Sequence, residues 1–351
     1  MYDMGVIHPE ISKAETLSSK YYTDVTMFSK ILEKFETSWN FIGHKAMMED
    51  VTKKSIHVGC EPMILTKDES VYNCISNVCT HRGMVLVDGC ENGNAVVCPY
   101  HGRTFSLSGG LRNMPEFEGV QGYPSEADDL VKAEVACWKN LLFAKLSGDY
   151  EFSRFISTVE ARMSFLKLDS FRYNSTMDRS HKIKTNWMLY VDNYLEGFHI
   201  PFVHKDLNSI LDFTSYDTEL FENGVLQVGF AKEGEAIFEI PKGHVDYGKS
   251  IAAYYWWLFP NLMLNFYPWG MSLNLVKPID VGSTEVIYHG FVLDETKLGL
   301  GAGGDLDKVE MEDQYVVEAC YVGMKSKNYD SGRYSPKMEK GVHHFHRLLT
   351  D

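Results

Sequence analysis

Two short segments, each with one cysteine and one histidine, restrict the folding of this chain more than any other feature of its sequence. The first is Cys79-Thr80-His81-Arg82-Gly83, and the second is Cys98-Pro99-Tyr100-His101-Gly102. Sixteen residues separate His81 from Cys98. The glycine after each pair lets the backbone turn sharply, and Pro99 stiffens the second segment. The pattern predicts two tight loops that bring four metal-ligating side chains together.

Two cysteines and two histidines can hold a [2Fe–2S] cluster, with thiolates on one iron and imidazoles on the other. Neutral imidazoles raise the reduction potential of such a cluster by hundreds of millivolts above that of a four-thiolate cluster. The alternative is a structural zinc site, because the same four groups also form a tetrahedron. Zinc fingers, however, pair cysteine with cysteine and histidine with histidine. We therefore predict that Cys79, His81, Cys98 and His101 bind a [2Fe–2S] cluster.

A second pattern follows further along the chain, in the segment Asp192-Asn193-Tyr194-Leu195-Glu196-Gly197-Phe198-His199-Ile200-Pro201-Phe202-Val203-His204. Five residues of an unbroken helix rotate by about 140°, which would splay His199 and His204 apart. Pro201 cannot donate a hydrogen bond to the carbonyl of Gly197, and the resulting distortion can turn both imidazoles towards one point. We expect the two histidines to bind one metal ion.

Two histidines and one carboxylate form the facial triad of non-haem iron(II) sites, which keeps positions open for dioxygen. An apolar stripe at helical spacing runs from Val309 to Met324, and Asp313 lies on it. Glu312 falls near the edge of this stripe and Glu310 well off it. A carboxylate on a buried stripe is costly unless it is paired or metal-bound. Asp313 is the expected third ligand; the alternative is a buried, hydrogen-bonded aspartate.

The two motifs together resemble the oxygenase (alpha) subunits of Rieske-type non-haem iron oxygenases, from Trp39 onward. The resemblance implies an enzyme that activates dioxygen at a mononuclear Fe(II), held by His199, His204 and Asp313, with electrons from its Rieske [2Fe–2S] cluster. The chain departs from the usual pattern at Arg103, where many members have tryptophan. We expect this change to leave cluster binding intact and to alter the surface around the cluster.

The same resemblance assigns Glu196 to a position between two metal centres. Its carboxylate can accept from the ring of His199 and from a cluster histidine, His101, of a neighbouring subunit, which would orient the ligands and provide an electron route. The alternative for Glu196 is a solvated charge on a helix face. Phe198 replaces the commoner tyrosine. Family members form homotrimers in which the cluster of one subunit serves the iron of the next, and we expect the same here.

The fold class expected is α+β, with two domains. From Trp39 to Leu146, short β-rich runs separated by Gly, Asn and Asp turn signals predict an all-β domain. The remainder mixes strands and helices. The resemblance implies a Rieske domain over 39–147 and a helix-grip catalytic domain, an antiparallel sheet with helices, over 148–351. Residues 1–38 are expected to form a helical segment that packs on the catalytic domain.

The net charge of the chain and two motifs that it lacks restrict the kinds of partner that we expect. The net charge is −14, and no basic cluster could displace the counterions of a nucleic acid, so we expect no nucleic-acid partner. The sequence has neither a strand followed by GxGxxG nor a second cysteine cluster of ferredoxin spacing. We therefore expect electrons from NAD(P)H to arrive through a separate reductase or ferredoxin.

The expected location is the cytoplasm. No segment approaches the roughly 18 uncharged apolar residues of a membrane span. The start, Met1-Tyr2-Asp3-Met4, has neither a basic region nor an apolar run, so we expect no secretory signal. Seven cysteines are an odd number that includes a metal-binding pattern, which fits a reducing compartment better than a disulfide framework.

The C-terminal segment indicates a substrate class. Tyr329–Tyr334 and Gly341–His346 resemble the tail of choline, carnitine and glycine-betaine monooxygenases, which act on trimethylammonium compounds. The run Tyr254-Tyr255-Trp256-Trp257, with Tyr267 and Trp269, could form an aromatic box for such a cation. The alternative, which we favour, is a pair of strands that pack a core.

Three functions are consistent with these motifs. The predicted one is a monooxygenase that hydroxylates or N-dealkylates a small organic substrate, with a quaternary ammonium compound as the candidate. The second is a ring hydroxylase, or dioxygenase, for an aromatic or alicyclic substrate. The third is a pure electron-transfer Rieske protein, which is disfavoured because it has no use for His199, His204 and Asp313.

Overall fold

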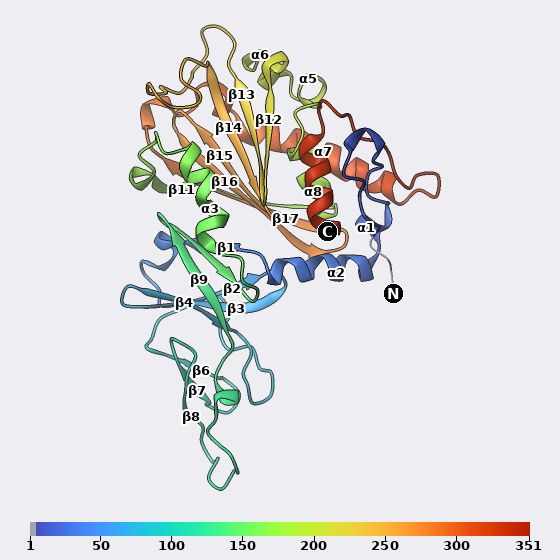
Figure 1. The fold of residues 1–351 in the computed structure, drawn as a ribbon. Coiled ribbons are helices and arrows are strands. Elements are labelled where there is room, and N and C mark those ends of the chain that lie inside the picture. Colours follow the sequence, from blue (N-terminus) through green and yellow to red (C-terminus); the bar gives the residue numbers. More distant parts are fainter. Residues whose placement is uncertain (1–4) are drawn as a thin grey trace. The chain divides into compact units, whose positions relative to one another are not determined.

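The structure is a computed structural model that describes residues 5–351. The first residues of the predicted N-terminal segment, Met1–Met4, lie outside the described residues. The chain forms two compact units: a first unit of Leu32–Ile156, and a second that joins the residues up to Ile31 with Ser157–Asp351. The elements of both are shown in Figure 1. The domain boundaries at 38/39 and 147/148 remain predictions.

The first unit is built from antiparallel β-sheets. A seven-stranded sheet has the order β1-β10-β9-β4-β3-β2-β5, and a three-stranded sheet has the order β6-β7-β8. Their strands are β1 (Asn40–His44), β2 (Lys53–Val58), β3 (Glu61–Asp68), β4 (Val71–Ser76), β5 (Cys90–Glu91), β6 (Ala95–Val97), β7 (Thr104–Ser106), β8 (Leu111–Asn113), β9 (Lys132–Trp138) and β10 (Leu141–Lys145). The predicted all-β architecture of this region is confirmed.

The two cysteine–histidine loops leave this scaffold at two places. Cys79 and His81 lie in the connection from β4 to β5, and Cys98 and His101 lie in the hairpin between β6 and β7. Both cysteines belong to a buried apolar cluster that includes Phe105. Because both cysteines are held in a packed core, the position at which each loop begins is fixed.

The second unit is a seven-stranded antiparallel sheet with helices, as the expected helix-grip fold requires. Its order is β11-β17-β16-β15-β14-β13-β12. Its strands are β11 (Arg172–Ile183), β12 (Asp217–Phe221), β13 (Gly224–Phe230), β14 (Ile251–Leu258), β15 (Leu262–Tyr267), β16 (Gly270–Asp280) and β17 (Ser283–Val292). Its helices include α1 (Lys20–Thr23), α4 (Trp187–Tyr194), α5 (Ile200–Val203), α6 (Lys205–Ile210), α7 (Leu306–Met324) and α8 (Lys340–Thr350). Helices α2 (Val25–Glu36) and α3 (Phe152–Arg162) cross the boundaries between the units.

Helix α4 is the central helix of the second unit, because it contacts β16, α7 and α8. The segment before residue 32 also reaches it: the hydroxyl of Tyr22 donates to Asp192 Oδ2 at 2.8 Å. His346 of α8 places Nε2 2.8 Å from Asp192 Oδ1. The chain ends are thus tied to the helix that leads into the histidine motif.

The aromatic run of β14 divides between the core and a cavity. Tyr254, Trp256 and Trp257 are fully buried, and the Trp257 ring packs edge-on against another aromatic ring at 5.1 Å. Tyr255 and Tyr267 instead line a cavity. Core packing therefore accounts for most of the run, and the box interpretation applies to two tyrosines only.

Candidate metal centres

Two helix ends bring the histidines of the second motif together. Asn186 caps α4 by accepting from the N–H of Met188 at 3.0 Å. After α4 ends, His199 lies directly before the short helix α5 and His204 directly after it. The sequence analysis predicted one helix distorted by Pro201. This is wrong: Pro201 sits in the first turn of a separate helix, where its missing N–H is tolerated.

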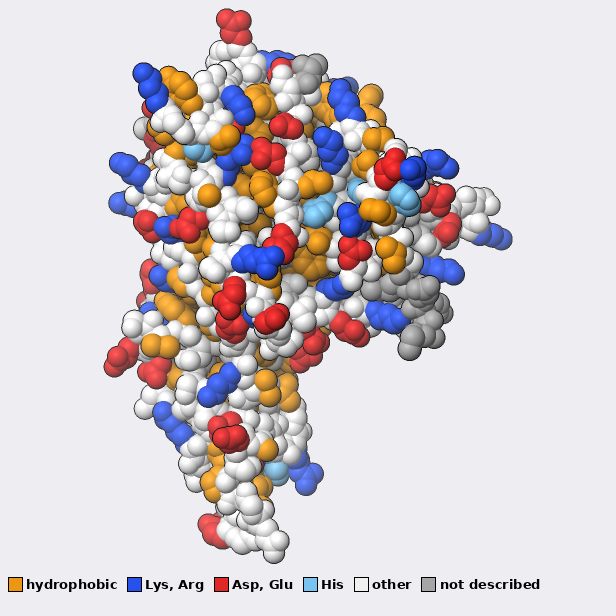
Figure 2. All heavy atoms as spheres, viewed as in Figure 1, with side chains coloured by type: hydrophobic (Ala, Val, Ile, Leu, Met, Phe, Trp, Pro, Cys, Tyr) orange, Lys and Arg blue, Asp and Glu red, His pale blue; other side chains and the backbone are white. Residues whose placement is uncertain are grey.

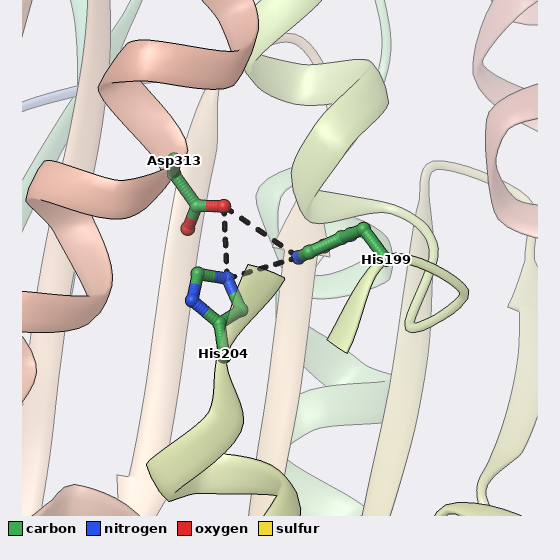
Figure 3. Close-up of side chains that lie close together, drawn as sticks. All are labelled: His199, His204 and Asp313. Carbon is green, nitrogen blue, oxygen red and sulfur yellow. Dashed lines mark hydrogen bonds and ion pairs between the residues drawn. The ribbon is translucent and has the colours of Figure 1, made fainter. Parts of the chain in front are cut away.

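His199, His204 and Asp313 converge on one point, as Figure 3 shows. His204 Nε2 lies 3.1 Å from His199 Nε2 and 3.0 Å from Asp313 Oδ1, and His199 Nε2 lies 3.5 Å from the same oxygen. Asn193 donates to Asp313 Oδ1 at 2.6 Å and fixes the carboxylate. Two imidazole nitrogens and one carboxylate oxygen on one side of a site are the donor set of a facial-triad iron(II).

A second carboxylate stands behind each histidine. His199 Nδ1 lies 2.7 Å from Glu196 Oε1, and His204 Nδ1 lies 2.8 Å from Glu312 Oε2. Because these carboxylates accept the Nδ1 protons, both rings keep Nε2 free for a metal. The helical wheel placed Glu312 near the edge of the stripe and offered no sign of this role, which depends on how α7 faces α5.

The charge on His204 makes metal uptake depend on pH. Burial lowers its pKa, but the hydrogen bonds and charges of Asp313 and Glu312 outweigh burial, so the pKa of His204 lies above its ordinary value. Protonated His204 therefore stabilises the metal-free fold. This stabilisation is fully present below the unfolded pKa of about 6.5, and it is lost as the pH rises through the higher folded pKa. A metal competes with that proton.

We therefore expect Fe(II) affinity of the second unit's site to fall as the pH drops from about 8 to about 6. Anaerobic calorimetric titration of metal-free protein would measure it. In Glu312→Gln the fall should begin at a lower pH, because one source of the raised pKa is gone. An affinity that does not change over this range would contradict the assignment.

Glu310 is a carboxylate that the sequence analysis placed wrongly. It was put well off the inward stripe of α7, yet its carboxylate accepts from the hydroxyls of Tyr190 and Tyr288, the latter at 2.6 Å, and from Asn274 Nδ2 at 3.3 Å. Burial, followed by the charge of Asp313, raises the pKa of Glu310 to about 7. The wheel failed because this part of α7 lines a polar cavity, so apolar residues do not mark its inward side.

A cavity of about 90 Å³ opens beside the triad. Glu310 and the three triad residues contribute to its wall. Five tyrosines line it as well: Tyr190, Tyr194, Tyr216, Tyr255 and Tyr267. Burial is the largest cause that raises the pKa of each of these phenols, so all five stay neutral near pH 7. Gly197 permits the packing, because a Cβ there would meet the Tyr216 ring at 2.8 Å.

The cluster loops have the backbone form that the sequence predicts. The N–H of Gly83 donates to Cys79 O at 2.9 Å, and that of Gly102 donates to Cys98 O at 3.0 Å. Both glycines have positive φ, +70° and +74°, which favours glycine. These bonds close one tight turn around each cysteine.

The four candidate cluster ligands gather at the ends of these loops. Cys79 and Cys98 are each 3% exposed. Burial is the largest cause that raises the pKa of Cys79, and the neighbouring Cys98 thiol adds to it. The rings of His81 and His101 lie 4.9 Å apart, edge to face. Two buried sulfurs beside two more accessible imidazoles fit a cluster with one thiolate-bound and one imidazole-bound iron.

Two family models match the chain. Residues 38–124 match the Rieske [2Fe-2S] domain, and residues 170–351 match the catalytic domain of the ring hydroxylating alpha subunit. The chain therefore belongs to the oxygenase (alpha) subunits of the Rieske non-haem iron oxygenases. It is an iron-dependent oxygenase whose cofactors are a Rieske [2Fe–2S] cluster and a mononuclear iron.

Two individual relatives give a more specific comparison than the two family models do. Chloroplastic choline monooxygenase of Arabidopsis thaliana is 30% identical over 97% of this chain and 83% of its own length. The carnitine monooxygenase oxygenase subunit of Escherichia coli (strain K12) is 27% identical over 96% of this chain and 94% of its own. The branch expected from the C-terminal segment is thus the branch of these relatives.

Solved structures share the fold over nearly the whole chain. The quaternary ammonium Rieske monooxygenase CntA in complex with L-carnitine matches with a TM-score of 0.76, 22% identity and 98% coverage of both chains. Naphthalene 1,2-dioxygenase from Rhodococcus sp. matches with a TM-score of 0.73 and 16% identity over 95% of this chain and 92% of that one. In the described part of the chain, none of the helices has the length and apolar character needed to cross a membrane.

Proposed function

We propose that this chain is the oxygenase component of a monooxygenase that hydroxylates or N-demethylates a small quaternary ammonium compound. The observation that carries the proposal is the cavity beside the triad, with five tyrosines and the carboxylate of Glu310 in its wall. Aromatic faces and a carboxylate attract a cation that cannot donate hydrogen bonds. The names of the relatives, choline and carnitine monooxygenases, support the same class.

In this proposal His199, His204 and Asp313 hold the mononuclear iron, and Cys79, His81, Cys98 and His101 hold the cluster. When bound, the iron supplies open positions for dioxygen and the cluster supplies a stored electron. The chain's own residues do the rest of the positioning, beginning with Glu196, which orients the His199 ring through Nδ1.

The substrate would be held by the cavity wall. Glu310 is fixed by three donors, so its carboxylate has a set position relative to the tyrosine faces. A cation bound beside it would lower its pKa from about 7 and favour the charged form. The hydroxyl of Tyr194 donates to Asn265 Oδ1 at 2.7 Å, which locks that ring. A trimethylammonium group seated among these rings would present an N-methyl or an adjacent methylene to the triad, because Glu310 and Asp313 are neighbours on α7.

A substrate panel tests this function. Purified protein, supplied with electrons and dioxygen, would be incubated with choline, carnitine, glycine betaine and aromatic acids, and products would be identified by mass spectrometry. We expect a hydroxylated product or formaldehyde from a trimethylammonium compound. Products from the aromatic acids alone, such as a diol, would instead support the ring hydroxylase.

We propose that electrons reach the chain from NAD(P)H through a separate reductase or ferredoxin. The sequence supports this, because it has no second cluster motif. Its one match to Gly-x-Gly-x-x-Gly, at Gly299–Gly304, does not directly follow a strand and lies next to an antiparallel sheet, so it is not the dinucleotide-binding fingerprint of a βαβ unit. A cytoplasmic location belongs to the same proposal: the cluster cysteines must stay reduced before they take up iron.

We further propose a homotrimer in which the cluster of one copy lies next to the mononuclear iron site of a neighbouring copy. Apolar side chains are exposed on the segments that carry the mononuclear ligands: Phe202 is 76% exposed beside His204, and Tyr315 is 77% exposed on α7 near Asp313. Tyr100, next to His101 in the cluster loop, is 59% exposed. Two different apolar patches on one chain suit a head-to-tail ring of copies. A solved structure of a quaternary ammonium Rieske monooxygenase, which is similar to this chain, gives insights into inter-subunit electron transfer in that protein.

The expected result for Phe202→Asp combined with Tyr315→Asp is a shift from trimer to monomer, because two charges would enter an apolar interface. Light scattering on a size-exclusion column would measure the mass. Val245→Asp is the matched control, since Val245 is 67% exposed elsewhere in the same unit. The proposal fails if the wild type runs as a monomer or if the double variant keeps the wild-type mass.

A further inference from the structure

Arg103 is a charged residue in the interior of the first unit. The sequence analysis expected it to alter the surface near the cluster, which is wrong, because its side chain is only 2% exposed. Its Nη2 lies 2.6 Å from Asp128 Oδ1 and donates to the carbonyl of Asp128 at 3.2 Å. The guanidinium carbon also lies 5.8 Å from the ring centres of Phe105 and Tyr123 and 6.0 Å from that of Phe117.

Asp128 joins the two cluster loops through this arginine. Its carbonyl accepts from the hydroxyl of Thr80 at 2.8 Å, and Thr80 stands between the two ligands of the first loop. On the second loop, the carbonyl of Arg103 accepts from the N–H of Cys98 at 2.7 Å. A single residue outside both loops therefore holds one residue from each.

The packing around Arg103 extends to a cluster histidine. The ring of Phe117, which faces the guanidinium, also packs edge-on against His81 at 5.5 Å and 89°. Removing the arginine would therefore loosen a wall that supports a ligand, in addition to removing a charge.

The charge of Arg103 is less screened than that of its partner. The Asp128 side chain is 21% exposed, whereas the arginine is buried, so water screens the negative member of the pair more. Arg103 Nε has no hydrogen-bond partner among the described residues.

We propose that Arg103, held by Asp128, is a positioning residue that raises the reduction potential of the Rieske cluster. Reduction adds one negative charge to a cluster, and a nearby buried cation stabilises the reduced form more than the oxidised form. This inference rests on the cluster ligands proposed above. Arg103 would thus adjust the reduction potential of the cluster from a position where many family members have tryptophan.

Redox titration of the loaded protein, followed by the electron paramagnetic resonance signal of the reduced cluster, tests the inference. Arg103→Gln should lower the midpoint potential, because it removes the cation and leaves Asp128 unpaired. Asp128→Asn should raise the potential, because it keeps a polar group beside an arginine that has lost its counter-charge. Arg103→Lys should stay closer to the wild type than Arg103→Gln.

Opposite shifts in the two single variants separate an electrostatic role from a structural one, since mere loosening of the loops would not depend on the sign of the charge removed. The double variant Arg103→Gln with Asp128→Asn should return towards the wild-type potential. Arg112→Gln is the matched control: Arg112 is an exposed arginine on β8 of the same small sheet, so its removal should shift the potential much less.

Unchanged potentials, or shifts of the same sign in Arg103→Gln and Asp128→Asn, would overturn the inference. If Arg103→Gln does not load a cluster, Asp128→Asn and Arg103→Lys still decide it, because a raised potential in the former and a near-native one in the latter are both required. Failure of the wild type itself to show a Rieske signal would refute the proposed ligands, which is a separate outcome.

Discussion

Replacing His204 with alanine is expected to abolish oxygenation and to leave the cluster intact. His204 is 1% exposed, and its Nε2 lies within 3.1 Å of both other triad residues. Its loss leaves two ligands, too few to retain a facial-triad iron. Turnover should fall by more than the roughly 10- to 100-fold loss that follows removal of an outer-shell partner.

Iron analysis with spectroscopy checks this result. The wild type should contain about three irons per chain, and His204→Ala about two, because a Rieske cluster holds two. The resonance signal of the reduced cluster should be unchanged, since its ligands lie in the other compact unit. His343→Ala is the control histidine: its Nε2 bonds the carbonyl of His8, away from the triad. If His204→Ala retains the third iron and full turnover, His204 is not a ligand of the mononuclear iron.

Replacing Glu310 with glutamine is expected to weaken the use of a cationic substrate while the metals stay bound. Glutamine keeps the shape, and its carbonyl oxygen in the place of Oε2 can still accept from Tyr288. Its amide nitrogen cannot accept the weaker bond from Asn274, which goes to Oε1 at 3.3 Å. Losing one charge of a buried pair costs about 2 kcal/mol or more, which is about 30-fold in kcat/KM. Steady-state kinetics with the accepted trimethylammonium substrate would measure the loss.

A neutral analogue supplies the control for Glu310→Gln. When a tert-butyl group replaces trimethylammonium, shape is kept and charge is lost, so kcat/KM for this analogue should be nearly equal in the wild type and the variant. Equal losses for the cation and the neutral analogue would show that Glu310 supports the cavity wall and does not recognise charge.

The cluster loops and the two histidines of the triad could be predicted from sequence because their signals are local. The spacing within Cys79–Gly83 and Cys98–Gly102 restricts the backbone directly, and the positive φ at both glycines bears this out. Asp313 was found for a partly wrong reason. The stripe from Val309 to Met324 passes through Cys320, which is exposed, whereas the buried residues of α7 are Val317 and Tyr321.

The substrate cavity could not be predicted, because its wall is assembled from distant segments. Tyr216 precedes β12, Tyr267 ends β15 and Glu310 lies in α7, and no spacing rule links them. The favoured interpretation of the β14 run, core packing, holds for most of its residues, and the box applies to Tyr255 alone within this strand. Strand alternation sends Tyr255 to the cavity and Trp256 to the core. The burial of Arg103 was also not predicted, because nothing in the sequence shows that a charged loop residue will pair with Asp128 in the interior.

Single turnover tests most directly whether both metal sites of this chain work together. Protein reduced chemically and freed of excess reductant would be exposed to dioxygen and a trimethylammonium substrate, with product and the cluster signal followed together. One electron from the cluster and one from Fe(II) suffice for one monooxygenation, so we expect roughly one product per chain at most, formed as the cluster signal disappears. Loss of the cluster signal with no product from any trimethylammonium compound or aromatic acid, in protein that holds its full iron, would contradict the account.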